Sequence, residues 1–263
     1  MSAKIIAVAN QKGGVGKSTT AVNIADVLKH KKVGNKNLKV LLIDLEPQHN
    51  SSSNYRAKIE GENTIYDVFN DNCKATEAIQ ITQMGDIIPG DSLLIEDEMK
   101  FRSKVGSEGL LKKRIKELYD KYDYIILDTP PNAGVYMLNA LTVCDGCIIP
   151  VMASQFAVEG LSQILQTISD VKDAVNEKIR IYGVLLTRYD KRKKIDQSVW
   201  KALPEVGKEN GFQVFKRPIR ICQDIETAQS LHTSVIDNFH GGYAAEDYIA
   251  VTNELLKKIK EDN

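Results

Sequence analysis

Short apolar runs alternate along this chain with longer segments in which apolar residues recur at helical spacing. The runs have the length and composition of buried parallel strands, and we expect strands at residues 4–9, 39–44, 86–89, 124–128, 146–151 and 181–187. The longer segments predict amphipathic helices at residues 18–31, 108–122, 157–174, 194–210 and 244–260. Strands that alternate with helices indicate an α/β fold: a mainly parallel, twisted sheet flanked by helices on both faces.

The chain is expected to form a single domain. Its 263 residues, 43% of them hydrophobic, are enough for one large buried core. No Ser/Pro/Gly-rich linker and no internal repeat divides residues 1–263. The first strand begins within the first few residues, so we expect no N-terminal helix-turn-helix module before it. In an open parallel sheet, ligands bind at the carboxyl ends of the strands, and we expect the functional residues there.

A glycine-rich segment follows the first expected strand and precedes the first expected helix. Residues 12–19 read Lys-Gly-Gly-Val-Gly-Lys-Ser-Thr, with the Gly-Lys-Ser ending of a nucleotide-binding P-loop. In such a loop Lys17 supplies a positive charge to the β- and γ-phosphates, and the Ser18 hydroxyl binds Mg²⁺. Backbone N–H groups turn toward the phosphate oxygens, and the following helix directs its positive end at them. The motif predicts these nucleotide-binding residues: Gly13, Gly14, Val15, Gly16, Lys17, Ser18 and Thr19.

Lys12 is an addition to an ordinary P-loop, and a lysine there could simply be solvated. With Lys12 included, the string resembles the deviant Walker A motif of ParA/MinD-type ATPases, among them the ParA/Soj-type DNA-partition ATPases. The resemblance implies a P-loop NTPase fold, ATP and Mg²⁺ as cofactors, and catalytic roles for Lys12 and Lys17. It also implies that Lys12 reaches across a dimer interface to the nucleotide of the partner subunit.

Two further expected strands end in an aspartate, Asp44 and Asp128. An acid at this edge of the sheet lies beside the phosphates, although Asp44 could also be a turn-forming residue. We expect Asp128 to hold the Mg²⁺ shell, through a water because Mg²⁺ keeps several of its waters. The family resemblance implies that Asp44 is catalytic and orients the attacking water. Glu46 and His49 stand where the family usually has Asp and Gly; these departures leave Asp44 in place and bear on the geometry of the loop that follows it.

The resemblance extends beyond the phosphate site. Residues 138–141 and 156–161 are similar to ParA-family segments that follow the second aspartate motif. Residues 183–190 resemble the strand and loop that approach the adenine in this family. Arg188 and Pro218 are therefore candidate base-site residues, although Arg188 could equally be an ordinary surface charge.

Charge is balanced over the whole chain but not along it. The 35 basic and 35 acidic residues give a net charge of zero, which argues against a general affinity for nucleic acid. Residues 188–220, however, contain ten Lys/Arg and four Asp/Glu, and such clusters bind DNA phosphates in a salt-dependent way. A solvated, charged loop is the alternative. Arg192 and Arg220 match family positions where arginine contacts DNA, and the full set of candidate DNA-binding residues is Arg192, Lys193, Lys194, Lys216, Arg217 and Arg220.

Other features limit the cellular context. No stretch approaches the length of an apolar transmembrane helix, and no basic-then-apolar leader opens the chain. Four cysteines in a chain of this length do not indicate a disulfide framework, so we expect a cytoplasmic location. Cys144 and Cys147 have the spacing of a metal or redox pair but lead into an apolar run, where we expect buried core residues.

Together, the motifs and the resemblance predict a Mg²⁺-dependent ATPase for plasmid or chromosome partition. Its ATP-bound homodimer would bind duplex DNA without sequence preference, at the nucleoid, and a centromere-bound ParB-type partner would stimulate hydrolysis. The alternative is a MinD-like, membrane-associated regulator of division-site placement. Residues 255–263 offer few apolar side chains for a membrane surface, so we expect no stable membrane association. A third class, nitrogenase-reductase or cobyrinate-type enzymes, needs a cysteine-bound cluster or an additional substrate site.

Overall fold

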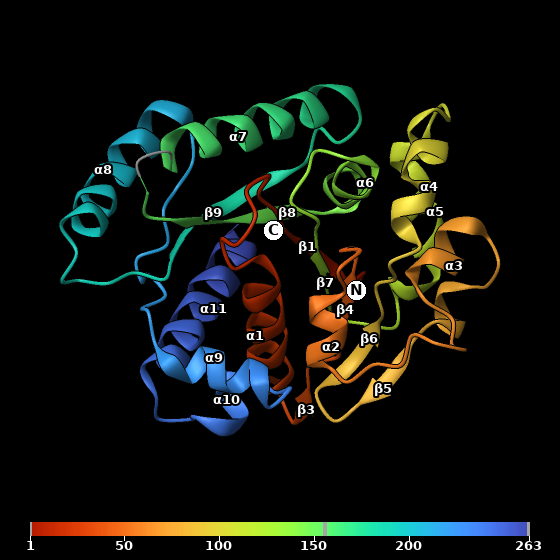
Figure 1. Cartoon of the computed structure of the whole chain (residues 1–263), viewed down its shortest axis with the longest axis horizontal. Helices are drawn as coiled ribbons and strands as arrows, with labels where there is room; N and C mark the ends of the chain where they lie inside the picture. Colours follow the sequence, from red (N-terminus) through yellow and green to blue (C-terminus); the bar gives the residue numbers. More distant parts are fainter. Residues whose placement is uncertain (1, 155–156, 262–263) are drawn as a thin grey trace.

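The structure, a computed structural model, describes residues 2–154 and 157–261. Seven strands form the main sheet: β1 (Lys4–Val8), β4 (Val40–Asp44), β5 (Gln80–Thr82), β6 (Gly85–Ile88), β7 (Tyr124–Asp128), β8 (Gly146–Met152) and β9 (Arg180–Thr187). Their order across the sheet is β5-β6-β4-β7-β1-β8-β9 (Figure 1). Every neighbouring pair is parallel except β5–β6, which is antiparallel. The predicted mainly parallel sheet is therefore confirmed.

Helices cover both faces of the sheet (Figure 1). One face carries α1 (Lys17–Lys29), α9 (Gln223–Ser230), α10 (Val235–Asn238) and α11 (Tyr243–Glu261). The other carries α3 (Ile65–Asn70), α4 (Leu94–Arg102), α5 (Leu110–Arg114), α6 (Val135–Val143), α7 (Ala157–Ala174) and α8 (Lys194–Asn210). Successive strand residues point to opposite faces, so Ile5 packs in one apolar core and Ile6 in the other. This explains why the central strands are apolar at consecutive positions.

Two smaller elements lie between α1 and β5. A separate two-stranded hairpin, β2 (Lys32–Val33) and β3 (Lys36–Asn37), leads from α1 into β4. The short helix α2 (Asn50–Asn54) follows β4 at the edge where the parallel strands end. Among the helices that the structure describes, none combines the length and apolar character needed to span a bilayer.

The predicted helices agree unevenly with the structure. The bounds predicted for α7 and α8 are confirmed, but the single helix predicted at residues 108–122 is wrong. Two 3-10 turns, Ser107–Gly109 and Lys116–Leu118, flank the five-residue α5 there. Ile115 leaves the helical region (φ −95°, ψ 5°), which lets the backbone turn toward the sheet. The Tyr119 carbonyl then accepts the Ala3 N–H at 2.6 Å, a tertiary contact that outweighs the helical pattern.

Strand register brings the expected functional segments to one place. Asp44 at the end of β4 and Asp128 at the end of β7 are register partners, and Val8 at the end of β1 is the partner of Asp128 on the other side. The glycine-rich loop after β1 and both acids therefore share the carboxyl edge of the sheet, as predicted.

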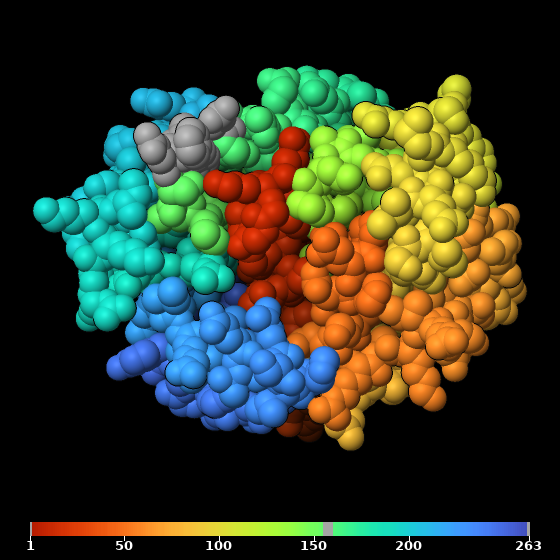
Figure 2. All heavy atoms as spheres, viewed as in Figure 1, coloured from red at the N-terminus to blue at the C-terminus, as the bar shows by residue number. Residues whose placement is uncertain are grey.

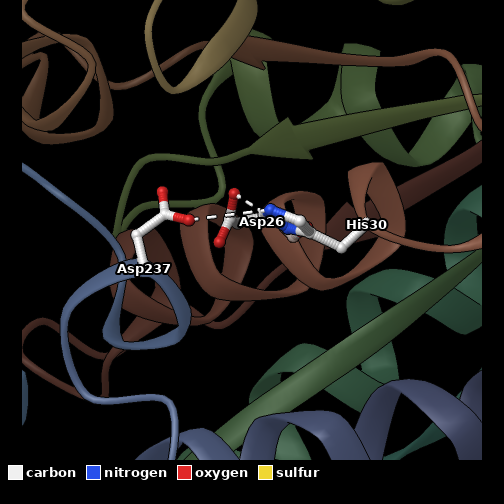
Figure 3. Close-up of side chains that lie close together, drawn as sticks. All are labelled: Asp26, His30 and Asp237. Carbon is white, nitrogen blue, oxygen red and sulfur yellow. Dashed lines mark hydrogen bonds and ion pairs between the residues drawn. The ribbon is translucent and has the colours of Figure 1, made fainter.

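Polar contacts fasten the segment that carries α9 and α10 to α1. Asp26 of α1, His30 directly after α1 and Asp237 of α10 point toward one another (Figure 3), and the Ser234 hydroxyl donates to the fully buried Asp26 carboxylate. The three side chains are close enough to share a metal ion. Lys29 Nζ, however, lies 2.7 Å from Asp26 Oδ1 and already supplies the neutralising charge. The Lys29–Asp26 ion pair and the hydrogen bond from Ser234 account for the buried Asp26 carboxylate, and the contact with Ser234 holds α10 against α1.

Candidate nucleotide-binding site

The glycine-rich loop has the backbone that phosphate binding needs. Gly14 and Gly16 have φ values of 73° and 87°, a left-handed conformation that favours glycine because it has no Cβ. Gly16 leads directly into α1, so the free N–H groups of the first helical turn face the loop. Thr187 Oγ1 donates to the Val15 carbonyl at 2.8 Å and ties the loop to the end of β9. The structure thus places the predicted loop at a helix N-terminus, where anions bind.

Lys17 and Lys12, the two lysines of the loop, point in different directions. Lys17 is only 6% exposed, and its Nζ donates to the Lys12 carbonyl at 3.2 Å. Burial lowers the pKa of Lys17, while the charges of Asp128 and Glu46 oppose that shift. The Lys12 side chain is exposed, and its Nζ donates to Ser154 Oγ at 3.2 Å, near the start of α7. Lys17 therefore points into its own loop, as the predicted phosphate contact requires, and Lys12 points away from the loop toward Ser154.

The two strand-end aspartates are fully buried. Burial raises the pKa of Asp128 to about 7, with a further contribution from Asp44, while the Ser18 and Ser51 hydroxyls and Lys17 lower it. Burial likewise raises the pKa of Asp44 to about 6, against hydrogen bonds from Ser52 that favour its charged form. Both carboxylates are held in a dry site where only a cation or hydrogen-bond donors stabilise their charge.

The residues around Asp128 suit a magnesium ion. Asp128 Oδ2 accepts the Ser51 hydroxyl at 2.7 Å, whereas the buried Oδ1 has no hydrogen-bond partner in the described part of the chain. The Ser18 hydroxyl lies close enough to lower the pKa of Asp128. A hydroxyl and a carboxylate oxygen beside a phosphate-binding loop are hard oxygen ligands of the kind that Mg²⁺ prefers.

Glu46 is a residue of this site that the sequence did not mark as functional. It is 7% exposed and lines the cavity next to the loop, whereas Asp44 is fully buried and does not line it. Burial raises the pKa of Glu46 to about 7, and Asp128 raises it further. An available signal was that Glu46 stands where the ParA/MinD-type family usually has a second aspartate. The water-orienting role of Asp44 stays a prediction.

A cavity of about 700 Å³ extends from the loop toward α9 and α11, a volume in the range of small-molecule sites. Figure 2 looks onto this side, where the red N-terminal segment lies between orange residues around α2 and blue residues of α9 and α10. The loop, including Gly13, Lys17 and Ser18, lines one end. Apolar side chains line the far end, where a base would lie: Ile219, Ile221, Ile225, Ala228 and Tyr248.

Of the two candidate base-site residues, only one lines the cavity. Arg188 lines the cavity and adopts a left-handed conformation, with φ 53°. Pro218 is not among the residues that line it, but the next residue, Ile219, is. Gln229 of α9 donates from Nε2 to Thr19 Oγ1 at 2.8 Å, so α9 meets α1 beside the cavity. The roles of Arg188 and Pro218 stay predictions, and the sequence did not indicate that α9 would line the cavity.

The two basic segments of the predicted DNA surface do lie side by side. Tyr189 pairs with the 219–221 segment through hydrogen bonds to both of its ends. Arg217 and Arg220, however, both bind Asp247, which is fully buried at the start of α11. Their charges are therefore largely committed to holding α11 against this segment.

The remaining basic residues of the predicted surface are more available. Lys193, Lys194 and Lys216 are exposed. Arg192, with 81% of its side chain exposed, binds both carboxylate oxygens of Asp190 at 2.9 Å. Hydrogen bonds from Arg192 lower the pKa of Asp190 to about 2, so this pair stays charged.

Cys144 and Cys147 are buried core residues, as predicted. Burial raises the pKa of Cys147 to about 12, and the pKa of Cys144 is also raised well above its ordinary value. Such thiols are poor metal ligands and poor nucleophiles. The family-like segment 156–161 lies partly outside the described residues.

Comparison with known proteins identifies the family. Residues 3–181 match the AAA domain family. Over 255 residues the chain is 36% identical to the sporulation initiation inhibitor protein Soj of Bacillus subtilis, covering 96% of this chain and 98% of that protein. It is 34% identical over 263 residues to the chromosome partitioning protein ParA of Caulobacter vibrioides, covering 98% and 96%. The chain belongs to the ParA/Soj family.

Solved structures agree with this ParA/Soj assignment. A plasmid partition protein from Borrelia burgdorferi bound to AMPPNP is 28% identical with a TM-score of 0.81, covering 97% of this chain and 99% of that one. Cobyrinic acid a,c-diamide synthase from Mycobacterium smegmatis, with ADP and magnesium, is 27% identical with a TM-score of 0.83, covering 99% and 97%. This ParA/Soj-type protein has the P-loop NTPase fold and is a DNA-segregation ATPase.

Proposed function

We propose that this protein acts as an ATP-dependent homodimer that holds DNA for as long as ATP is bound. The dimer binds duplex DNA without sequence preference. A ParB-type centromere-binding partner stimulates hydrolysis of ATP to ADP and phosphate, and the dimer then separates and releases the DNA. The cycle takes place in the cytoplasm, with the ATP-bound form associated with the nucleoid.

The different placement of the two loop lysines carries this proposal. Lys17 is buried inside its own loop, whereas Lys12 is exposed and its Nζ points away from the loop to Ser154 Oγ. One positive charge is thus available to the nucleotide of the same subunit and the other to a nucleotide that approaches from outside. A lysine that completes the partner's site makes nucleotide binding and dimerisation depend on each other.

Different residues of the chain have different roles in ATP binding and hydrolysis. Lys17 exchanges its hydrogen bond to the Lys12 carbonyl for the phosphate oxygens. Ser18 and Asp128 would hold Mg²⁺, which would neutralise the charge that develops on the phosphates. Asp44, at the end of the neighbouring strand, orients the attacking water. The apolar end of the cavity takes the base.

Substitution of Asp44 tests the catalytic assignment. Asp44→Ala should bind ATP and Mg²⁺ and dimerise, because Lys12, Lys17 and Asp128 remain. Its partner-stimulated hydrolysis should fall by more than tenfold, a loss above about 1.4 kcal/mol in transition-state stabilisation. Partner-stimulated turnover of Asp44→Ala above a tenth of the wild-type rate would remove Asp44 from the mechanism.

The exposed lysines test the DNA assignment. Lys193→Ala combined with Lys194→Ala should weaken duplex binding by the ATP-bound form and reduce its salt dependence, because each lost phosphate contact lowers the slope of log affinity against log salt by about 0.9. Lys32→Ala with Lys36→Ala, in the exposed β2–β3 hairpin, is the matched control, since it removes the same charge elsewhere. Equal weakening in both double variants would mean that net charge, not this surface, controls binding. A wild-type protein without ATP-dependent DNA binding would refute the proposed cycle.

A further inference from the structure

We propose that Ser51 and Ser52, adjacent residues of α2, are positioning residues for the two strand-end carboxylates, with Ser52 orienting Asp44 and Ser51 orienting Asp128. The inference rests on the proposed function, because it assigns both serines to the hydrolysis that Asp44 and Asp128 support. It adds α2 to the working parts of the site. None of the motifs in the sequence includes either serine.

The two carboxylates need such partners because of where the sheet places them. Asp44 and Asp128 are register partners on neighbouring parallel strands, and both are fully buried. Adjacent buried carboxylates repel each other and lose their hydration, so their charged forms depend on nearby donors. The pKa of each is raised by burial, and hydrogen bonds from Ser52 and Ser51 oppose that shift.

Ser52 orients Asp44 through two consecutive hydrogen bonds, and the backbone N–H at the start fixes which group donates in each. The Gly90 N–H, which can only donate, gives its hydrogen to Ser52 Oγ at 2.8 Å. The Ser52 hydroxyl in turn donates to Asp44 Oδ2 at 2.7 Å, and the Ser52 N–H reaches the same oxygen at 2.8 Å. The Glu46 N–H donates to Asp44 Oδ1 at 3.1 Å. Both oxygens are thus held, and Oδ1 keeps a lone pair for a further donor.

Close packing makes this relay rigid. A Cβ at Gly90 would lie 2.8 Å from the Glu46 carbonyl oxygen and 3.0 Å from Asp44 Cγ. The backbone after β6 therefore approaches Asp44 as closely as glycine allows, and it brings its N–H within reach of Ser52. The rotamer of Asp44 is set by three separate chain segments: the end of β4, α2 and the residues after β6.

Ser51 fixes one oxygen of Asp128 and would leave the other for a metal ion. Its hydroxyl donates to Asp128 Oδ2 at 2.7 Å. Asp128 Oδ1 is buried and has no hydrogen-bond partner among the described residues, so this oxygen is left for the Mg²⁺ shell. A partner that fixes one oxygen of a metal-binding carboxylate orients the other, and such partners affect metal affinity strongly.

One short helix serves both acids and also contacts the cavity. Neighbouring helical side chains diverge by about 100°, so Ser51 and Ser52 reach different strands. Asn50, Ser53 and Asn54 of the same helix line the nucleotide cavity. A nucleotide that shifts α2 therefore moves the partners of both carboxylates together.

Single hydroxyl deletions in the full-length chain test the inference, and each serine is the matched control for the other. Ser52→Ala should lower kcat for ATP by about ten- to a hundredfold and leave the Mg²⁺ dependence of fluorescent ATP-analogue binding unchanged. Ser51→Ala should raise the Mg²⁺ concentration for half-maximal analogue binding by about tenfold. A merely structural role for α2 predicts the same change in both variants, which would overturn the assignment.

An isosteric pair keeps the test valid if Ser52→Ala is unstable. Ser52→Thr and Ser52→Val add the same bulk, but only Thr keeps the hydroxyl, so turnover should be clearly higher for Thr. Equal turnover of the two would overturn the role of Ser52. Asp44→Ala, measured in the same assay, separates a failure of the proposed role of Asp44 from a failure of the positioning role of Ser52. If it is as active as wild type, the proposed role of Asp44 fails. If it is inactive while Ser52→Ala is fully active, only the positioning inference fails.

Discussion

Replacement of Arg220 should destabilise the fold, so a loss of DNA binding in such a variant would not identify a DNA contact. The sequence places this arginine in a candidate DNA surface, but the structure places it against a buried acid. Asp247 is fully buried, and Arg220 donates to it from Nε at 2.8 Å, from Nη2 at 2.7 Å and from its backbone N–H at 3.0 Å. The guanidinium also lies 4.4 Å from the centre of the Tyr243 ring. Arg220→Ala removes every one of these contacts except the backbone hydrogen bond.

The contacts of Arg220 determine how much Arg220→Ala should lower the free energy of unfolding. Removal of one partner of a buried ion pair costs about 3–5 kcal/mol when the other is left uncompensated. Here Arg217 remains bound to Asp247 with Nε at 2.7 Å, and the Arg220 side chain is 30% exposed, so about 2 kcal/mol of that cost applies. The lost contact with Tyr243 adds about 0.5 kcal/mol. We expect Arg220→Ala to lower the free energy of unfolding by about 2–3 kcal/mol.

Urea unfolding followed by circular dichroism measures this directly, with the free energy taken from linear extrapolation. Lys208→Ala is the control, because the side chains of Lys208 and its ion-pair partner Glu205 are 73% and 70% exposed, and exposed ion pairs contribute little. Its midpoint should stay near that of wild type. A free energy of unfolding for Arg220→Ala within about 0.5 kcal/mol of wild type would refute the reasoning about Asp247. With the expected loss, weaker DNA binding by Arg220→Ala is no evidence for a DNA contact.

Three further outcomes are expected. Lys12→Ala should keep most of its ATP binding but lose dimerisation with a non-hydrolysable analogue in gel filtration, and wild-type dimerisation would exclude the action of Lys12 across the interface. In EDTA, the free energy of unfolding should fall as the pH rises from about 4 toward 7. The pKa values of Asp44 (about 6) and Asp128 (about 7) are raised in the native state, which therefore holds protons that the unfolded chain has released. Urea titrations that show a rise in the free energy of unfolding over this pH range would contradict these shifts. In the native protein, Cys222 should react with an alkylating agent at pH 8 well before Cys147, because the Cys147 thiol is fully buried and has a pKa of about 12. Peptide mass spectra measure the labelling of each cysteine. Equal labelling of the two would show that the core opens readily.

The sequence alone determined the parallel strands and the phosphate loop, because both depend on residues that are contiguous in the chain, whereas the antiparallel edge strand β5 was not predicted. A buried parallel strand is apolar at consecutive positions, and a P-loop needs its glycines, lysine and serine in one run. The register of β1, β4 and β7 then follows from parallel pairing, so the meeting of Asp44 and Asp128 at one edge was predictable. The long helix α8 was predictable for the same reason, since its apolar stripe repeats over several turns.

Only the tertiary structure decided the partners of these residues. Ser51 reaches an aspartate 77 positions further along the chain, and Gln229 reaches Thr19 across 210. Arg220 could not be separated from a DNA-binding arginine by sequence, because Asp247 belongs to another element. Periodicity reports the side of an element that a residue occupies, but it carries no information about what packs against that side. Hydrogen bonds and ion pairs between distant segments form only once the core has brought those segments together, and they decide here which polar residues serve the site and which hold the fold.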